Sequence, residues 1–275
     1  MVPTPIGNLL DITYRSIDIL KKVDYIITEN KKHTSILLNY FFIKNKLLTL
    51  NIINEKKKTQ DYINILKDGN NLALVSNAGT PVINDPGFLL IKYAYDNNIR
   101  VVPLPGSCAA ITALSASGLQ SNKFCYEGFL SKKKQLCQNQ IKKLSEEKRT
   151  IILYESPKRL INTIKLIKKI MGKKRKILVA KEITKKWENI QRGAADKILD
   201  KISNDDNWKK GEITIIINGI KEKKIQSIPK KIFKIINIIK KETSVSSAIK
   251  IVSKIYGYPK NILYNAIINK FKKVD

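Results

Sequence analysis

Short apolar runs alternate along the first 220 residues with stretches whose apolar residues recur at helical spacing, which is typical of an α/β protein. The apolar runs predict strands at residues 25–29, 72–76, 100–104, 150–155, 176–182 and 212–218. The periodic stretches predict helices at residues 17–23, 59–66, 88–95, 109–117, 132–144 and 157–170. We therefore expect strands and helices to alternate along most of the chain.

Changes in composition predict the domain boundaries. A helix of small residues ends at Gly118 and a polar loop follows, which indicates two α/β domains, residues 1–117 and 118–220. The lysine-rich stretch 221–231 is expected to be a basic linker, and residues 232–275 a separate basic tail. The predicted fold class is thus α/β with two α/β domains and a small helical C-terminal tail.

The tail predicts two helices joined by a turn. Thr243 or Ser244 can cap a first helix that runs to about Ile255, and Gly257 ends it. Pro259 suits the first turn of a second helix. This pattern is typical of a helix-turn-helix and equally of a helical hairpin that packs on the body, so both remain open.

The charge is strongly positive. The chain has 52 Lys and Arg against 23 Asp and Glu, a net charge of +29, which favours a nucleic-acid partner. Residues 221–275 carry +11 of this charge, with 14 lysines against three acidic residues. Only six of the 52 cationic residues are arginines, and the abundant lysine could instead be a solvated surface. An RNA-facing tail is the favoured interpretation.

Several classes of protein are disfavoured. Three cysteines without a C-x-x-C spacing indicate neither a disulfide framework nor a zinc ribbon. No apolar run approaches the roughly 18 residues of a membrane span, and no leader is evident, so a cytoplasmic protein without a membrane partner is expected. With His33 as the one histidine and no glycine-rich dinucleotide or phosphate loop, we expect no metal, nicotinamide or P-loop site.

Four loops rich in glycine, proline and small polar residues follow predicted strands or open the chain, at residues 3–9, 76–81, 105–110 and 154–157. Ligands of open α/β sheets bind at the carboxyl ends of strands, where loops and helix N-termini offer free N–H groups. The residues alone therefore predict an enzyme with a small-molecule crevice and a basic accessory tail.

Together these loops carry a specific resemblance. The runs from Val2 (VPTPIGNLLDIT), Val75 (VSNAGTPVINDPG) and Val102 (VPLPGSCAAITAL) closely resemble those of the ribosomal RNA small subunit methyltransferase I family. The motifs YEGFL at Tyr126, YESP at Tyr154, KEITK from residue 181 and KNILY from residue 260 continue the match in order. The resemblance covers essentially the whole chain.

The resemblance implies a tetrapyrrole methylase-like fold, in which two α/β domains enclose a cleft for S-adenosylmethionine. It also implies a homodimer that methylates the ribose 2′-hydroxyl of a decoding-centre cytidine in 16S rRNA of the small ribosomal subunit. Carried over by motif, the residues that bind the methyl donor are Pro5, Ser76, Asn77, Gly79, Thr80, Ile83, Asn84, Asp85, Ser107, Cys108, Ala109, Ala110, Tyr154 and Glu155.

A ribose hydroxyl is a poor nucleophile, so a base that accepts its proton would help. The candidate bases, all at or just beyond strand ends, are Glu155, Asp85 and Glu29; Glu29 and Glu155 could instead only cap helices or pair with lysines. The candidate RNA-binding residues are Lys32, His33, Lys158, Arg159, Lys185, Lys250, Lys254 and Lys260.

Three departures from the family's usual pattern stand out. Asn77 replaces an aspartate, Asn30-Lys31-Lys32 replaces Asp-Thr-Arg, and Ser107 replaces a proline. Two rival interpretations therefore stay open beside the rRNA methyltransferase. One is a methyltransferase of the same fold that acts on a tetrapyrrole or another small molecule. The other is a nonenzymatic RNA-binding factor with a degenerate pocket.

Overall fold

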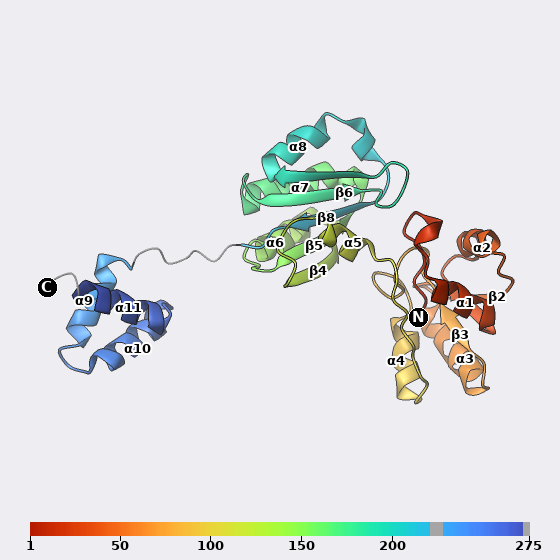
Figure 1. Cartoon of the computed structure of the whole chain (residues 1–275), viewed down its shortest axis with the longest axis horizontal. Coiled ribbons are helices and arrows are strands. Elements are labelled where there is room, and N and C mark those ends of the chain that lie inside the picture. The colour runs from red at the N-terminus through yellow and green to blue at the C-terminus, as the bar shows by residue number, and fades with distance from the viewer. Residues whose placement is uncertain (221–227, 272–275) are drawn as a thin grey trace. The chain divides into compact units, whose positions relative to one another are not determined.

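The computed structural model describes residues 1–220 and 228–271. The chain divides into two compact units, Met1–Ile220 and Lys221–Asp275, each with its own core (Figure 1). The first unit contains two sheets, and the elements among the described residues of the second are helices.

The first sheet of unit 1 is parallel, with β1 (Tyr25–Thr28) between β2 (Lys46–Thr49) and β3 (Leu72–Leu74). Helices α1 (Tyr14–Lys22) and α2 (Lys31–Tyr40) pack on one face, and α3 (Glu55–Lys67) and α4 (Phe88–Asp96) on the other. Successive side chains of a strand point to opposite faces. Accordingly, Ile26 joins the core under α1 and α2, whereas Ile27 joins the core under α3 and α4.

The second sheet has five strands in the order β4 (Phe124–Phe129), β5 (Thr150–Glu155), β8 (Ile213–Ile217), β6 (Lys176–Lys181) and β7 (Asn189–Ala194). Helices α6 (Lys134–Leu144), α7 (Pro157–Met171) and α8 (Ala195–Ser203) cover one face, and α5 (Ala109–Ser115) covers the other. The three central strands β5, β8 and β6 are buried on both faces, so they read as continuous apolar runs rather than alternating ones.

Strand direction determines which ends of this sheet meet. β5 and β6 each pair antiparallel with β8, while β4 runs parallel to β5. The carboxyl ends of β4, β5 and β6 therefore share one edge with the start of β8. In the register, Glu155 and Lys181 both lie opposite Ile213.

The predicted boundary after residue 117 places α5 in the first domain. In the structure, Ala110, Ala113 and Leu114 of α5 pack on Ile152, Leu178 and Ile216 of the second sheet. The alanines allow this helix to approach the sheet closely. Helix α5 therefore packs with the second sheet, although the predicted boundary assigns it to the first domain.

The described part of unit 2, residues 228–271, contains the helices α9 (Lys230–Ile239), α10 (Val245–Tyr256) and α11 (Lys260–Phe271). The two predicted tail helices are confirmed: the Ser244 side chain caps α10, and Gly257 ends it with a left-handed φ of 72°. The sequence prediction missed α9. Residues 221–227 of the predicted linker lie outside the described residues, and Lys230 and Lys231 belong to α9 rather than to a linker.

Most other predicted elements match within a few residues, but the predicted strand at residues 100–104 is wrong. Pro103 has no N–H to give to a ladder. The segment instead hydrogen-bonds the chain start, with the Leu104 N–H donating to Met1 O (3.0 Å) and the Met1 ammonium to Val102 O (2.9 Å). The strands β2, β4 and β7 and the helices α2 and α8 were not predicted. Across the residues that the structure describes, no helix is long and apolar enough to cross a membrane.

Candidate active site

Three of the glycine- and proline-rich loops are tied together by backbone hydrogen bonds. Thr4 and Gly79 exchange both of their backbone bonds, at 2.9 and 3.0 Å. The Thr4 hydroxyl donates to Ser76 O (3.2 Å), and the Thr80 hydroxyl donates to Ser107 O (3.0 Å). The opening loop, the 76–81 loop and the 105–110 loop thus converge, as the sequence analysis required.

Two glycines are needed for this convergence. Gly79 has a φ of 79°, in the left-handed region that side chains disfavour. A Cβ on Gly106 would lie 2.5 Å from the Cβ of Pro3, so only glycine lets the two loops touch without a shift.

The fourth loop joins from the second sheet. The Tyr154 hydroxyl, near the end of β5, accepts the Ala110 N–H at the start of α5 (3.2 Å). The Tyr126 hydroxyl on β4 donates to Asn84 Oδ1 (2.5 Å) in the loop that follows β3. Residues of both sheets are therefore bonded across the same space.

These loops and strand ends enclose a cavity of about 420 Å³. That volume lies within the roughly 300–1,000 Å³ of small-ligand pockets. The predicted donor-binding residues that line it are Asn77, Gly79, Thr80, Ile83, Asn84, Asp85, Cys108, Ala109, Tyr154 and Glu155. Pro5, Ser76, Ser107 and Ala110 lie in the same loops but not among the lining residues.

The lining also contains residues that the sequence analysis did not single out as donor-binding: Ile6, Ala78, Phe129, Ser156, Pro157, Ile183, Gly211, Glu212, Ile213 and Thr214. Ile6, Phe129, Ser156 and Pro157 lie inside or beside quoted motifs, so their positions carried a signal. The 211–214 segment had no such signal in the sequence. It lies at the cavity because β8 runs antiparallel to β5, which places the start of β8 beside the end of β5.

Asn77 and Asp85 line one wall of the cavity, and Glu29, which is not among the lining residues, is hydrogen-bonded to Asn77; we call these three residues the acidic wall. Glu29 and Asn77 follow the neighbouring parallel strands β1 and β3, and Asn77 Nδ2 donates to Glu29 Oε2 (2.9 Å). The buried Asn77 Oδ1 has no hydrogen-bond partner. Among the described residues, no lysine or arginine forms an ion pair with Glu29 or Asp85.

This environment changes the acidity of Asp85. Partial burial, and then repulsion from Glu29, raise the pKa of Asp85 to about 6; the nearby Ser76 hydroxyl offsets part of the rise. A carboxyl group with that pKa is ionised at neutral pH and is a better proton acceptor than an ordinary aspartate. Asp85 thus combines a position in the cavity lining with a raised pKa.

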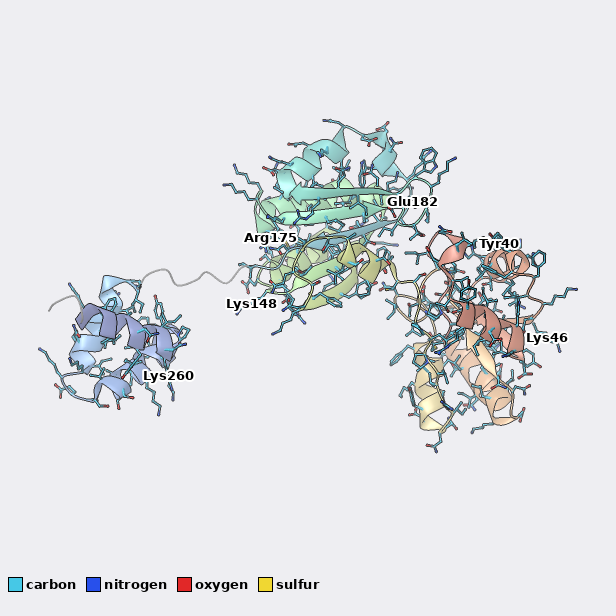
Figure 2. All side chains as sticks on the ribbon, in the orientation of Figure 1. Tyr40, Lys46, Lys148, Arg175, Glu182 and Lys260 are labelled. Carbon is cyan, nitrogen blue, oxygen red and sulfur yellow. The ribbon has the colours of Figure 1, made fainter. Side chains whose placement is uncertain are left out.

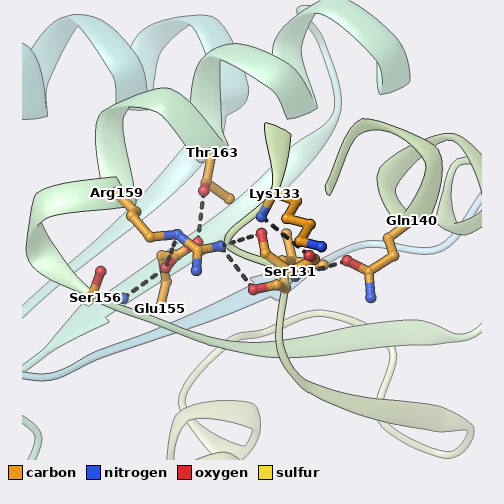
Figure 3. A network of polar contacts seen from close by, with 8 residues as sticks. Ser131, Lys133, Gln140, Glu155, Ser156, Arg159 and Thr163 are labelled. Carbon is orange, nitrogen blue, oxygen red and sulfur yellow. Dashed lines mark hydrogen bonds and ion pairs between the residues drawn. The ribbon is translucent and has the colours of Figure 1, made fainter. Parts of the chain in front are cut away.

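Glu155 is in a different position, as Figure 3 shows. Its side chain is 1% exposed, and its Oε2 accepts the Thr163 hydroxyl (2.6 Å). Its Oε1 accepts the Ser156 N–H (2.8 Å) and pairs with Arg159 Nε (3.2 Å). Arg159 also donates to the carbonyl groups of Leu130 and Ser131, which joins α7 to the loop after β4. By pairing with Arg159, Glu155 holds this arginine in place.

A second fastening lies beside it. Lys185 Nζ bonds Glu182 Oε1 (2.9 Å) and Glu212 Oε2 (3.0 Å), which joins the loop after β6 to the start of β8. Glu182, the residue that follows β6, is labelled in Figure 2. Burial acts against the charged form of Glu182, but the bonds from Lys185 and the Glu212 N–H, together with the charges of Lys185 and Lys181, outweigh it and lower the pKa of Glu182. We call Glu155 and Glu212, with their cations Arg159 and Lys185, the paired wall.

An aromatic group lies next to the paired wall. Tyr154 contacts Tyr126 and Phe129 edge-to-face, with ring centroids 5.2 and 5.7 Å apart. Burial raises the pKa of Tyr154 to about 12, so its hydroxyl stays protonated at neutral pH. Burial likewise raises the pKa of Tyr126.

The predicted RNA-binding residues divide into free and engaged side chains. Arg159 and Lys185 are engaged in the paired wall, whereas Lys32 and His33 in the first turn of α2 and Lys158 in α7 are exposed. The Asn30 side chain caps α2 by accepting the His33 N–H (3.3 Å), so this departure from the family pattern keeps a capping residue. Within unit 2, the side chains of Lys250, Lys254 and Lys260 are exposed.

No group of three or more His, Cys, Asp or Glu side chains within the described ranges, 1–220 and 228–271, is arranged to hold a metal ion.

Comparison with known proteins identifies the family. The sequence model described as Tetrapyrrole (Corrin/Porphyrin) Methylases matches residues 1–199. Ribosomal RNA small subunit methyltransferase I of Buchnera aphidicola subsp. Acyrthosiphon pisum (strain APS) is 50% identical over 98% of this chain and 96% of its own length. The protein of the same name from Escherichia coli O157:H7 is 42% identical over 96% of this chain and 92% of its own. The chain belongs to the tetrapyrrole methylase family, in the ribosomal RNA small subunit methyltransferase I branch.

The tetrapyrrole methylase fold is also visible in the solved structures. Cobalt precorrin-4 methyltransferase (CbiF), a cobalamin biosynthetic enzyme, superposes with a TM-score of 0.59 at 15% identity and covers 79% of this chain and 92% of its own. The predicted fold class is thus confirmed.

Proposed function

We propose that this protein is an S-adenosylmethionine-dependent methyltransferase that methylates a ribose 2′-hydroxyl of a decoding-centre cytidine in 16S rRNA of the small ribosomal subunit. The curated relatives named above are methyltransferases of small-subunit ribosomal RNA, and they match nearly the whole chain. The single observation that carries the proposal is the convergence of four predicted loops on one cavity of about 420 Å³.

The chemistry of the cavity suits this methyl donor, which carries its reactive methyl group on a positively charged sulfonium. Glu29 and Asp85 supply negative charge without a cation of their own, and the Tyr154 and Phe129 rings supply faces that attract cations. The unpartnered Asn77 Oδ1 offers an acceptor to an amine or hydroxyl group of the donor. Loops rich in glycine allow close approach of the backbone.

We propose Asp85 as the base that takes the proton from the ribose hydroxyl. Its raised pKa makes it a stronger proton acceptor than an ordinary aspartate, and it lines the cavity. Glu29 tunes that pKa by repulsion, while Glu155 holds α7 in place. Positioning the hydroxyl against the methyl group supplies much of the remaining rate.

We keep the exposed Lys32, His33 and Lys158 as the RNA contacts of unit 1, and Lys250, Lys254 and Lys260 as those of unit 2. The homodimer and the cytoplasmic location, where small subunits are assembled, also belong to this proposal. Light scattering of the purified protein tests the dimer.

Two measurements test the function. Calorimetric titration with S-adenosylmethionine should give saturable heat, and its absence would favour a nonenzymatic RNA-binding factor. Purified protein with tritiated donor should label 30S subunits that lack the modification, and mass spectrometry should place the label on one ribose. Labelling of a porphyrinogen instead of 30S subunits would contradict the proposal.

A further inference from the structure

The surface of α7 carries a row of positive charge that the proposed reaction does not use. Lys158, Lys165 and Lys169 are all exposed, and their spacing of seven and four residues places them on one side of the helix. We call these three residues the lysine stripe. None of the fifteen residues of α7 is acidic.

The lysine stripe begins at the cavity. Ser156 and Pro157 line the cavity, and Lys158 is the next residue. A helical rise of about 1.5 Å per residue puts the Cα atoms of Lys158 and Lys169 about 16 Å apart along the axis. The stripe therefore leads from the mouth of the cavity along the outside of the lobe.

The stripe ends in a hollow between α7 and α8. The hollow has a volume of about 580 Å³ and is lined by Lys165, Lys168, Lys169, Lys173 and Leu199. Among the described residues, none of its four lysines forms an ion pair. The two acidic residues of α8 do not pair with these lysines. Asp196 Oδ1 accepts the Lys197 N–H, and Asp200 has no ion pair in the described part of the chain.

The distribution of acidic residues is not uniform in unit 1. One lysine of α1 and one of α3 are paired on their own helices, Lys22 with Asp18 and Lys58 with Asp61, whereas α7 has no acidic residue to offer. Four neighbouring lysines without carboxylate partners repel one another, which is unfavourable unless an anion neutralises them. A polyanion with regularly spaced charges fits a row of point charges, and lysine binds phosphate as a point charge.

We propose that the lysine stripe and its hollow form a phosphate-binding track for the rRNA strand that enters the cavity. This inference rests on the proposed function, since the substrate must be RNA for a track at this position to serve it. The track would hold the backbone of nucleotides next to the methylated one. Phosphate contacts of this kind position a nucleic acid without reading its sequence.

The test compares two triple variants of equal charge. The track variant is Lys165→Gln, Lys169→Gln and Lys173→Gln; the control is Lys56→Gln, Lys57→Gln and Lys67→Gln, three exposed lysines of α3. Binding to protein-free 16S rRNA and to 30S subunits is measured against salt concentration. Each lost phosphate contact lowers the slope of log affinity against log salt by about 0.7–0.9.

We expect the track variant to lower the salt slope by about 2 and the affinity about tenfold or more at low salt, with the KM for 30S subunits raised and kcat kept. The control should change affinity by no more than about threefold. Equal losses in both variants would mean that only net charge matters and would overturn the track. An unchanged slope on protein-free rRNA, with a loss only on 30S subunits, would also overturn it in favour of an acidic protein partner.

Failure of the proposed function would look different. The wild-type protein would then transfer no methyl group to 30S subunits, while the track variant, and not the control, would still show a reduced salt slope. That result would support the phosphate-binding track and contradict the proposed methyl transfer.

Discussion

The acidic wall and the paired wall hold carboxylates in opposite environments, although both contribute residues to the lining of the same cavity. On the paired wall, Glu155 and Glu212 each have a cationic partner, Arg159 and Lys185. On the acidic wall, Glu29 has only the neutral Asn77 amide, and Asp85 has a raised pKa. The paired carboxylates fasten helices and strand ends in place, whereas the unpaired ones are available for chemistry.

The difference follows from the elements that carry each wall. Arg159 lies one helical turn after Glu155, in the same local segment. Lys185 is likewise local to Glu182, but its other partner, Glu212, lies 27 residues farther along the chain, at the start of β8. Glu29 and Asp85 lie in loops that meet only in the folded chain. The sequence of one loop taken alone therefore does not reveal whether its carboxylate has a cationic partner in the folded chain.

The largest expected effect comes from Asp85→Asn. Without a base, turnover at pH 8 should fall by about 10²–10⁴-fold, the usual contribution of a general base. Calorimetry should show saturable binding of the methyl donor in the variant. Turnover within threefold of the wild type would remove Asp85 as the base.

Glu155→Gln should act on stability instead. The amide cannot accept from Ser156, Arg159 and Thr163 together, and a buried donor left without a partner costs about 1–3 kcal/mol. Urea denaturation should show this loss, while turnover per folded molecule stays within a fewfold of the wild type. A stable variant with turnover as low as that of Asp85→Asn would reverse the roles of the two walls.

Tyr126→Phe should have an intermediate effect, because it removes the hydrogen bond to Asn84, the neighbour of Asp85. A typical bond of this kind contributes about 1 kcal/mol, so we expect kcat to fall about fivefold. Steady-state kinetics test this, with Phe129→Leu as a control that alters the aromatic group but not the hydrogen bond. Equal losses of kcat in both variants would mean that the hydrogen bond has no role of its own.

The smallest expected effect is that of Glu29→Gln. Repulsion from Glu29 helps to raise the pKa of Asp85, so removing that charge should lower the pKa and move the acidic limb of the rate profile below pH 6. The amide can still bond Asn77. A limb that stays in place or moves upward would show that Glu29 does not act on Asp85.

Much of the fold could be predicted from the sequence because local patterns specify it. The apolar runs of β5, β6 and β8 and the caps of α10 carried their own signals. The segment 100–104 was wrongly predicted as a strand because its residues are mostly apolar. Pro103 has no N–H to donate to a neighbouring strand. The four-residue strand β2 and the polar strand β7 are largely half-buried or exposed, so neither forms the continuous apolar run by which β5, β6 and β8 were predicted.

The site was predictable in part. The glycine and proline loops indicated where backbone would approach a ligand, and the resemblance placed them around one donor. The roles of Glu155 and Asp85 could not be separated, because burial and cation partners are properties of the folded chain. Residues 211–214 line the cavity because β8 runs antiparallel to β5, and no residue type in this segment predicts that direction.

The pH dependence of single-turnover methyl transfer to 30S subunits tests the central claim most directly. Asp85 must be deprotonated to act as a base, and its pKa is about 6. The wild-type rate should therefore rise about tenfold from pH 5 to a plateau above pH 7. The Asp85→Asn variant should be slow and independent of pH over this range. The same rise through pH 6 in the variant would contradict the account, because the titrating group would then lie elsewhere.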